Sequence, residues 1–153
     1  MIVISNQAAV GKGLLDPARL EEITVKMQQA LLQDGTPLAA AYYCTHRSDE
    51  NCVCRKPKPG LLLEAASDFN IDLPRSIFIG DSETDVRAAQ AAGSRPLLFG
   101  LGLQVSSDTA DWKSKVPFAT TAQALFLVAA GCLGEKTLMG PRDRSSASFG
   151  RDN

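Results

Sequence analysis

Two kinds of apolar segment alternate along this chain, and the alternation limits its possible folds more than any other feature. Short apolar runs at 1–4, 39–43, 76–79 and 96–99 have the length of buried strands. Between them, apolar residues recur at helical spacing over 17–34, 60–69 and 84–92, and a last helix is expected at 121–130. The repeated order of strand and helix predicts an α/β fold with a mainly parallel sheet flanked by helices.

The ends of the predicted helices carry recognisable signals. Asp16 and Pro17 suit the N-cap and the first position of a helix, while Gly35 and Gly93 suit helix ends. From residue 131 onward the chain is rich in Gly, Ser, Arg and Asp and poor in apolar residues. We therefore expect one domain over 1–130 and a disordered tail over 131–153.

Three of the four cysteines and the single histidine lie within eleven residues. They are Cys44, His46, Cys52 and Cys54. Thiolates with a neutral imidazole form the ligand set that zinc prefers, and a site with four protein ligands is structural because no position stays open for water. The alternative is a chance grouping of reduced thiols beside a surface histidine. The close spacing favours a structural zinc that stiffens this loop.

A basic pair, Arg55 and Lys56, follows the cysteines directly and precedes two prolines. Such residues are usually solvated surface charges. Here the neighbouring knuckle and the prolines restrict the backbone, which favours a binding role. A guanidinium can bind a phosphate or sugar hydroxyls with two hydrogen bonds, whereas an ammonium acts as a point charge.

Two further polar groups follow predicted strands. Asp81 and Asp85 come after the strand at 76–79 and suit Mg²⁺, although carboxylates at this position also complement a helix N-terminus. Ser5 and Asn6 follow the first strand and can donate hydrogen bonds to a phosphate, or form a simple polar turn. Because ligands gather at the carboxyl ends of parallel strands, these groups are expected to converge with the Cys44–Lys56 loop.

The composition limits the classes of partner that the chain is expected to bind. The formal net charge of −1 shows no polybasic field, so nucleic acid and anionic membranes are not expected partners. No apolar run approaches the length of a membrane span, and the N-terminal residues do not resemble a secretory signal. We therefore expect a cytoplasmic protein, whose reduced thiols are free to bind metal.

Three segments of the chain between Ile2 and Gly100 resemble the haloacid-dehalogenase-like (HAD) phosphatases of subclass IIIA. Within them the resemblance is to the branch of heptose bisphosphate phosphatases and histidinol phosphatases. The segments are Val3-Ile-Ser-Asn-Gln, Tyr42-Tyr-Cys-Thr-His with Cys52-Val-Cys-Arg-Lys-Pro-Lys-Pro-Gly, and Ile79-Gly-Asp-Ser-Glu-Thr-Asp-Val-Arg-Ala-Ala. The middle segment is the most specific, because few families join a zinc knuckle to Arg-Lys-Pro.

The resemblance implies a Rossmann-like HAD fold and a phosphatase that uses an aspartyl-phosphate intermediate, with catalytic Mg²⁺ and structural Zn²⁺. By motif, Lys56 and Asp81 would be catalytic, with Asp81 holding Mg²⁺ and Asp85 supporting its turn. Ser5, Asn6, Arg55 and Lys56 would bind phosphate and substrate. The zinc ligands would be the four residues of the Cys/His cluster.

One part of the family pattern is absent. The strand ending in Asp-x-Asp, expected upstream of Ile2, does not occur in the sequence, so the nucleophile and general acid are missing. That strand is central in the family, between the strands at 1–4 and 76–79, and its absence leaves unpaired edges. We therefore expect the chain alone to be poorly stable or self-associating, to be inactive, and to have as a possible partner a polypeptide that supplies the strand.

The Lys56-Pro-Lys-Pro-Gly run resembles heptose enzymes, so the expected substrate is a phosphosugar, D-glycero-D-manno-heptose 1,7-bisphosphate, cleaved at its 7-phosphate. The short gap between His46 and Cys52 also occurs in histidinol phosphatases, which leaves that activity as an alternative. A zinc-stabilised module that binds without turnover is another alternative.

Overall fold

The computed structural model describes residues 1–100 and 116–119. The elements run in the order β1 (Ile2–Asn6), α1 (Ala8–Gly11), α2 (Pro17–Gln33), β2 (Ala40–Cys44), α3 (Gly60–Phe69), the 3₁₀ turn η1 (Leu73–Arg75), β3 (Ile77–Gly80), α4 (Glu83–Ala92), β4 (Arg95–Phe99) and β5 (Phe118–Ala119). The expected alternation of strands and helices is confirmed. None of the described helices is long and apolar enough to cross a bilayer.

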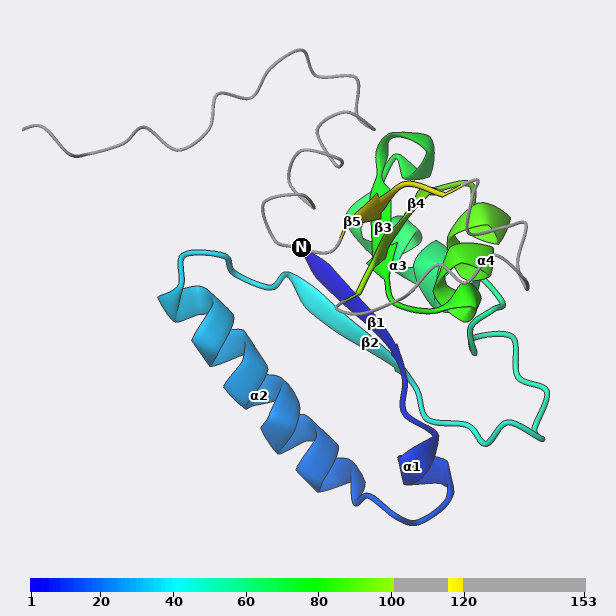
Figure 1. Cartoon of the computed structure of the whole chain (residues 1–153). Helices are drawn as coiled ribbons and strands as arrows, with labels where there is room; N and C mark the ends of the chain where they lie inside the picture. The colour runs from blue at the N-terminus through cyan, green and yellow to red at the C-terminus, as the bar shows by residue number, and fades with distance from the viewer. Residues whose placement is uncertain (101–115, 120–153) are drawn as a thin grey trace, which may run out of the picture.

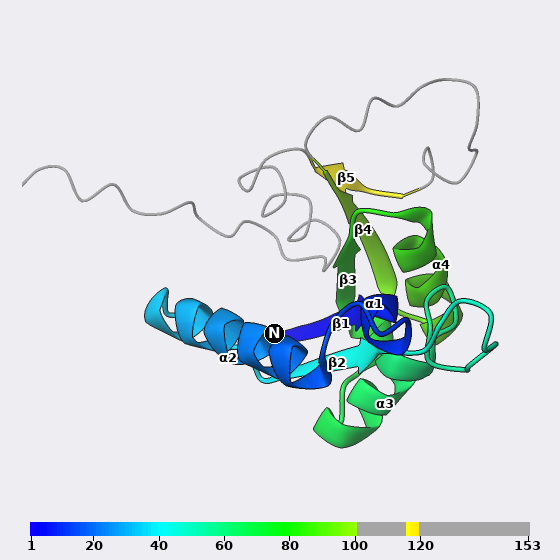
Figure 2. The same cartoon turned by 90° about the horizontal axis from the view of Figure 1, so that it is seen from below.

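The described strands form two parallel sheets where a single sheet was predicted. β1 pairs with β2, while β3, β4 and β5 form the second sheet in that order. α2 lies along the β1–β2 pair on the side away from α4 (Figures 1 and 2). The separation falls between β1 and β3, where the family pattern places a further strand.

Local sequence explains where the helices begin and end. Asp16 caps α2, its carboxylate accepting a hydrogen bond from Ala18 N at 2.8 Å, and Pro17 occupies the first turn, where its missing N–H costs nothing. Gly35 has a positive φ of 73° just after that helix. Asn70 ends α3 in the left-handed conformation that Asn adopts more readily than most residues.

Most of the buried apolar side chains belong to α3, α4 and β4, although Cys44 at the end of β2 is also fully buried, so the core lies mainly around the second sheet. Val86, Leu98 and Val116 form one buried cluster, with Phe118 packed against it. α2, by contrast, buries only Leu20 and Thr24 although it is the longest described helix. The first sheet and α2 therefore contribute less buried apolar surface than α4 and β4.

Several boundaries differ from those expected. β1 extends through Ser5 and Asn6, which were predicted to follow the strand. The short elements α1, η1 and β5 were not predicted. The expected helix at 121–130 and tail at 131–153 lie outside the described residues, so the domain boundary at 130 stays a prediction.

Candidate functional site

Lys56 joins the carboxyl ends of the two sheets. Its ammonium donates a hydrogen bond to the carbonyl of Ile4 in β1 at 3.0 Å and lies 2.5 Å from the Asp85 carboxylate at the start of α4. Its backbone N–H and carbonyl are both held by the side chain of Asn6, at 3.1 Å each. Polar groups from three chain segments therefore converge as expected.

The Lys56–Asp85 pair is withdrawn from water, with side-chain exposures of 12% and 7%. The ring of Phe78 lies 5.5 Å below the ammonium and adds a cation–π contact. Burial by itself would raise the pKa of Asp85, but hydrogen bonds from Lys56 and Ser82 outweigh it and lower the pKa. The carboxylate is therefore charged, and it fixes the ammonium at the sheet edge.

Asp85 also organises the turn that carries Asp81. Its Oδ2 accepts hydrogen bonds from the backbone N–H of Asp81 and of Ser82, both at 3.2 Å. Ser82 is the N-cap of α4, and its side-chain oxygen accepts a hydrogen bond from the Asp85 N–H. A Cβ at Gly80 would lie 2.3 Å from the Asp85 Cβ, so only glycine fits there. Asp81 itself is exposed and lines, with Lys56, a cavity of about 310 Å³.

Ser5 and Asn6 are occupied by contacts within the protein. Ser5 Oγ accepts a hydrogen bond from Gln7 Nε2 at 2.9 Å. The side-chain amide of Asn6 donates a hydrogen bond to the Lys56 carbonyl and accepts one from the Lys56 N–H, so Asn6 positions the loop. Sequence reasoning placed Asn6 near the phosphate but gave no sign of this clamp, because the partners are 50 residues apart.

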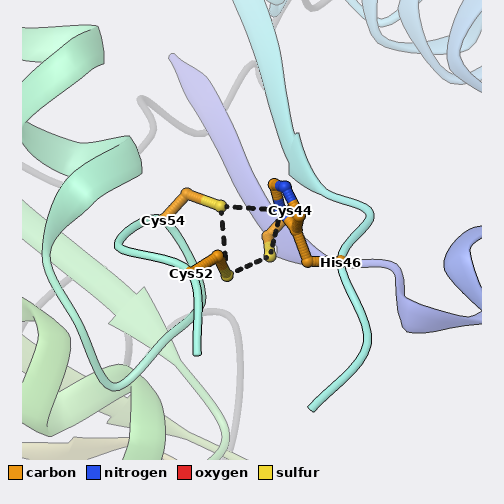
Figure 3. Close-up of side chains that lie close together, drawn as sticks. All are labelled: Cys44, His46, Cys52 and Cys54. Carbon is orange, nitrogen blue, oxygen red and sulfur yellow. Dashed lines mark hydrogen bonds between the residues drawn. The ribbon is translucent and has the colours of Figure 1, made fainter. Parts of the chain in front are cut away.

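The four zinc-ligand candidates lie together on two segments, one at the carboxyl end of β2 and one before α3 (Figure 3). Cys44 Sγ is 3.6 Å from Cys52 Sγ, Cys52 Sγ is 3.5 Å from Cys54 Sγ, and the Cys54 sulfur is 3.2 Å from His46 Nδ1. Their ligand atoms all lie within 4.8 Å of one another. A tetrahedral zinc with bonds of about 2.3 Å to sulfur needs sulfurs about 3.8 Å apart, so this set fits the ion.

The thiols resist ionising together without a cation. Burial, with the adjacent Cys44 and Cys52 thiols, raises the pKa of Cys54 to about 12. Burial also opposes ionisation of Cys52, but hydrogen bonds from the Cys54 thiol and the Arg55 N–H lower its pKa overall. A dication at the centre would remove this conflict, because zinc binds thiolates and not thiols.

Lys58 fastens the same loop, a role that the sequence did not suggest. Its ammonium donates hydrogen bonds to Asn51 Oδ1 at 2.7 Å, to the Asn51 carbonyl at 3.1 Å and to the Cys52 carbonyl at 2.8 Å. Arg55 reaches the His46 carbonyl at 3.5 Å. Arg55, Lys56 and Lys58 share the lining of a cavity of about 230 Å³ beside the cysteines.

Known proteins resemble both the sequence and the fold. Residues 53–123 match the HAD-hydrolase-like family. A D-glycero-β-D-manno-heptose-1,7-bisphosphate 7-phosphatase of Helicobacter pylori is 42% identical over 89 residues, which cover 58% of this chain and 51% of that protein. The enzyme of the same name from Bordetella bronchiseptica is 38% identical over 102 residues, covering 67% and 57%.

A crystal structure of D,D-heptose 1,7-bisphosphate phosphatase from B. bronchiseptica, complexed with magnesium and phosphate, is similar with a TM-score of 0.69 and 30% identity. The match covers 88% of this chain and 74% of that one. By sequence, this chain spans about half the length of the curated relatives it matches.

Proposed function

This chain belongs to the HAD-like hydrolases, and we propose that it supplies the substrate-binding part of a phosphatase acting on a heptose bisphosphate. The observation that carries the proposal is the position of Lys56. Its ammonium is held at the carboxyl ends of β1 and β3, where parallel sheets bind ligands. A cation fixed there attracts a phosphoryl group and is suited to stabilise the charge that develops during transfer.

The proposed reaction is phosphoryl transfer to a carboxylate. A carboxylate oxygen attacks phosphorus, the bond to the sugar oxygen breaks, and that oxygen takes a proton. Water then cleaves the aspartyl phosphate, releasing phosphate and restoring the carboxylate. The sequence contains no Asp-x-Asp pair, so we place the attacking group outside residues 1–153.

The chain's own residues have distinct roles in this proposal. Lys56 would balance charge at the phosphate, Arg55 would contact the substrate, and Ser5 Oγ would hold the phosphate once released from Gln7. Asn6 and Asp85 act indirectly, since one holds the Lys56 backbone and the other its ammonium.

Two metals belong to the proposal. Asp81 is the exposed carboxylate that would hold Mg²⁺, an ion that neutralises phosphate charge when bound. Cys44, His46, Cys52 and Cys54 would hold Zn²⁺, which leaves no open position and so supports the loop without taking part in the reaction. A cytoplasmic location is also part of the proposal.

The substrate assignment rests on the names of the relatives. The curated relatives described above act on D-glycero-β-D-manno-heptose 1,7-bisphosphate, which favours this sugar over histidinol phosphate. The basic cavity beside Arg55 and Lys58 is consistent with a doubly phosphorylated substrate. Removal of the 7-phosphate is the proposed reaction.

Restoring the missing carboxylates tests the function. The chain would be extended at its N-terminus by an apolar strand ending in Asp-x-Asp, and phosphate release from the heptose bisphosphate measured with Mg²⁺. We expect turnover by the extended chain, none by residues 1–153, and none when the two added aspartates are asparagines. Histidinol phosphate serves as the comparison substrate. If the extended chain is folded and zinc-loaded but hydrolyses neither compound, the proposed phosphatase activity is wrong and a non-catalytic binding module is favoured.

A further inference from the structure

Three cysteine sulfurs of the Cys/His cluster lie in contact, and none of them is in a disulfide. Cys52 is the middle one, with its Sγ 3.6 Å from Cys44 Sγ and 3.5 Å from Cys54 Sγ (Figure 3). Sulfurs joined in a disulfide are about 2.05 Å apart, so a small rotation of the side chains brings neighbouring sulfurs to bonding distance. A structural metal uses only the affinity of these thiols for cations and leaves their redox chemistry unassigned.

The three thiols differ in their access to solvent. Cys44, at the carboxyl end of β2, is 0% exposed. Cys52 and Cys54 are partly exposed, and Val53 between them is 77% exposed, so this turn faces the solvent. A small polar oxidant therefore reaches the outer turn before it reaches Cys44. Oxidation of cysteine follows such access, and a second thiol in contact with the first can complete the reaction as the resolving cysteine.

The packing of the outer turn decides which pair of sulfurs is favoured to bond. A Cβ at Gly60 would lie 2.5 Å from the Val53 carbonyl oxygen and 2.9 Å from the Cys54 Cα, so the turn lies directly against the start of α3. A bond between Cys52 and Cys54 would close a ring through one intervening residue, which requires this packed backbone to change. Cys44 and Cys52 belong to separate segments, so rotation of their side chains is sufficient.

We propose that the Cys/His cluster is also a site of reversible oxidation by hydroperoxides, at which Cys44 and Cys52 form a disulfide. The Cys52 sulfur attacks a peroxide oxygen, the O–O bond breaks, hydroxide leaves and a sulfenic acid forms. The Cys44 sulfur then attacks the Cys52 sulfur, and the sulfenic oxygen leaves as water with the proton of the Cys44 thiol. With hydrogen peroxide the two thiols lose two electrons and two protons in all, and two water molecules form. Exchange with a dithiol reverses the bond.

This bond uses two of the four metal ligands. Only His46 and Cys54 then remain, which is too few for a zinc ion that needs four. Loss of zinc rests on the proposed metal site, whereas the disulfide does not. Lys56 stays in place, because the contacts that hold it involve no cysteine side chain. Oxidation is therefore expected to free Arg55, the proposed substrate contact beside Cys54, while the buried cation keeps its position.

Peroxide treatment of the full chain tests the proposal. Cys132→Ser removes the fourth cysteine, so every remaining thiol belongs to the cluster. The zinc-loaded chain is treated with a modest excess of hydrogen peroxide. Free thiols are then counted with a chromogenic reagent after denaturation, and the new bond is mapped by mass spectrometry of peptides.

We expect the thiol count of this chain to fall from three to one, with Cys44 and Cys52 joined. Dithiothreitol should return the count to three, because the disulfide is reversible and higher oxidation states are not. A count that stays at three, or a bond mapped between Cys52 and Cys54, would overturn the proposal.

Two variants of the same background separate the roles of the thiols. Cys44→Ser removes the resolving sulfur, so Cys52 should remain a sulfenic acid that a cyclic diketone probe traps. Cys54→Ser is the matched control, since it removes a ligand but leaves the bonding pair, and it should form the disulfide with little trapping. Equal trapping in the two variants would contradict the assigned pair. Bond mapping on the parent chain needs neither variant, so it decides the question even if one of them fails to fold.

Zinc release is measured in the same samples with a zinc-binding dye, and the ion should leave as the disulfide forms. A chain that binds zinc and keeps its three thiols in peroxide would refute the oxidation and leave the metal site standing. A chain that binds no zinc but joins Cys44 to Cys52 would refute the metal site and support the oxidation.

Discussion

At the residue scale, the Lys56–Asp85 pair has the greatest consequences. Lys56→Met would leave Asp85 charged, buried and without its cation. Removing one partner of a buried ion pair typically costs about 3–5 kcal/mol, and we expect a loss of that size in the free energy of unfolding, measured with urea. Arg87→Met is the matched control, because its pair with Glu83 is exposed and weak. Equal losses in both variants would contradict the assigned role of Lys56.

The same pair predicts how stability depends on pH. The pKa of Asp85 is lower in the folded chain than the ordinary value of about 4 that applies when it is unfolded. Its contribution to stability is therefore fully present above about pH 4 and is lost as the pH falls through the folded pKa. Unfolding free energies measured between neutral pH and about pH 2 should show this loss. Asp85→Asn should be less stable at neutral pH and should show a shallower acid decline; an unchanged decline would assign it to other carboxylates.

At the element scale, the loop between β2 and α3 depends on Lys58 as well as on its metal ligands. Lys58→Met removes three hydrogen bonds to Asn51 and Cys52 and frees the backbone beside a ligand. Loss of such supporting contacts usually weakens metal binding about 10- to 100-fold, which a competition titration with a zinc-binding dye would measure. Lys26→Met, at an exposed position on α2, is the control. A Lys58 variant that binds zinc as tightly as this control would show that the ligands alone set the affinity.

The helices and loops also show which features could be predicted from the sequence. Helical spacing and caps predicted α2, α3 and α4 closely, because Asp16, Gly35 and Gly93 act through their nearest neighbours. The short elements α1 and η1 carry too few residues for a periodic pattern. The Cys/His cluster was found because its ligands are close in sequence. The clamp of Asn6 on Lys56 was not, because it depends on how β1 and the loop meet.

At the scale of the whole molecule, the division into two sheets decides how the chain opens. The second sheet and its helices hold most of the buried apolar residues, while β1, β2 and α2 bury few. The expectation of a poorly stable chain thus applies most to the first sheet, where β1 pairs with β2 alone among the described strands. The sequence could suggest that vacancy only through a family pattern, since no local signal records a missing neighbour.

Unequal opening of the two sheets is the last prediction. Amides of β4 and α4 should exchange with solvent more slowly than those of β1 and β2, since local opening follows buried contacts. Native-state hydrogen exchange measures this difference. Equal protection of β1 and β4 in the free chain would mean that α3 and the Lys56–Asp85 pair already couple the sheets fully.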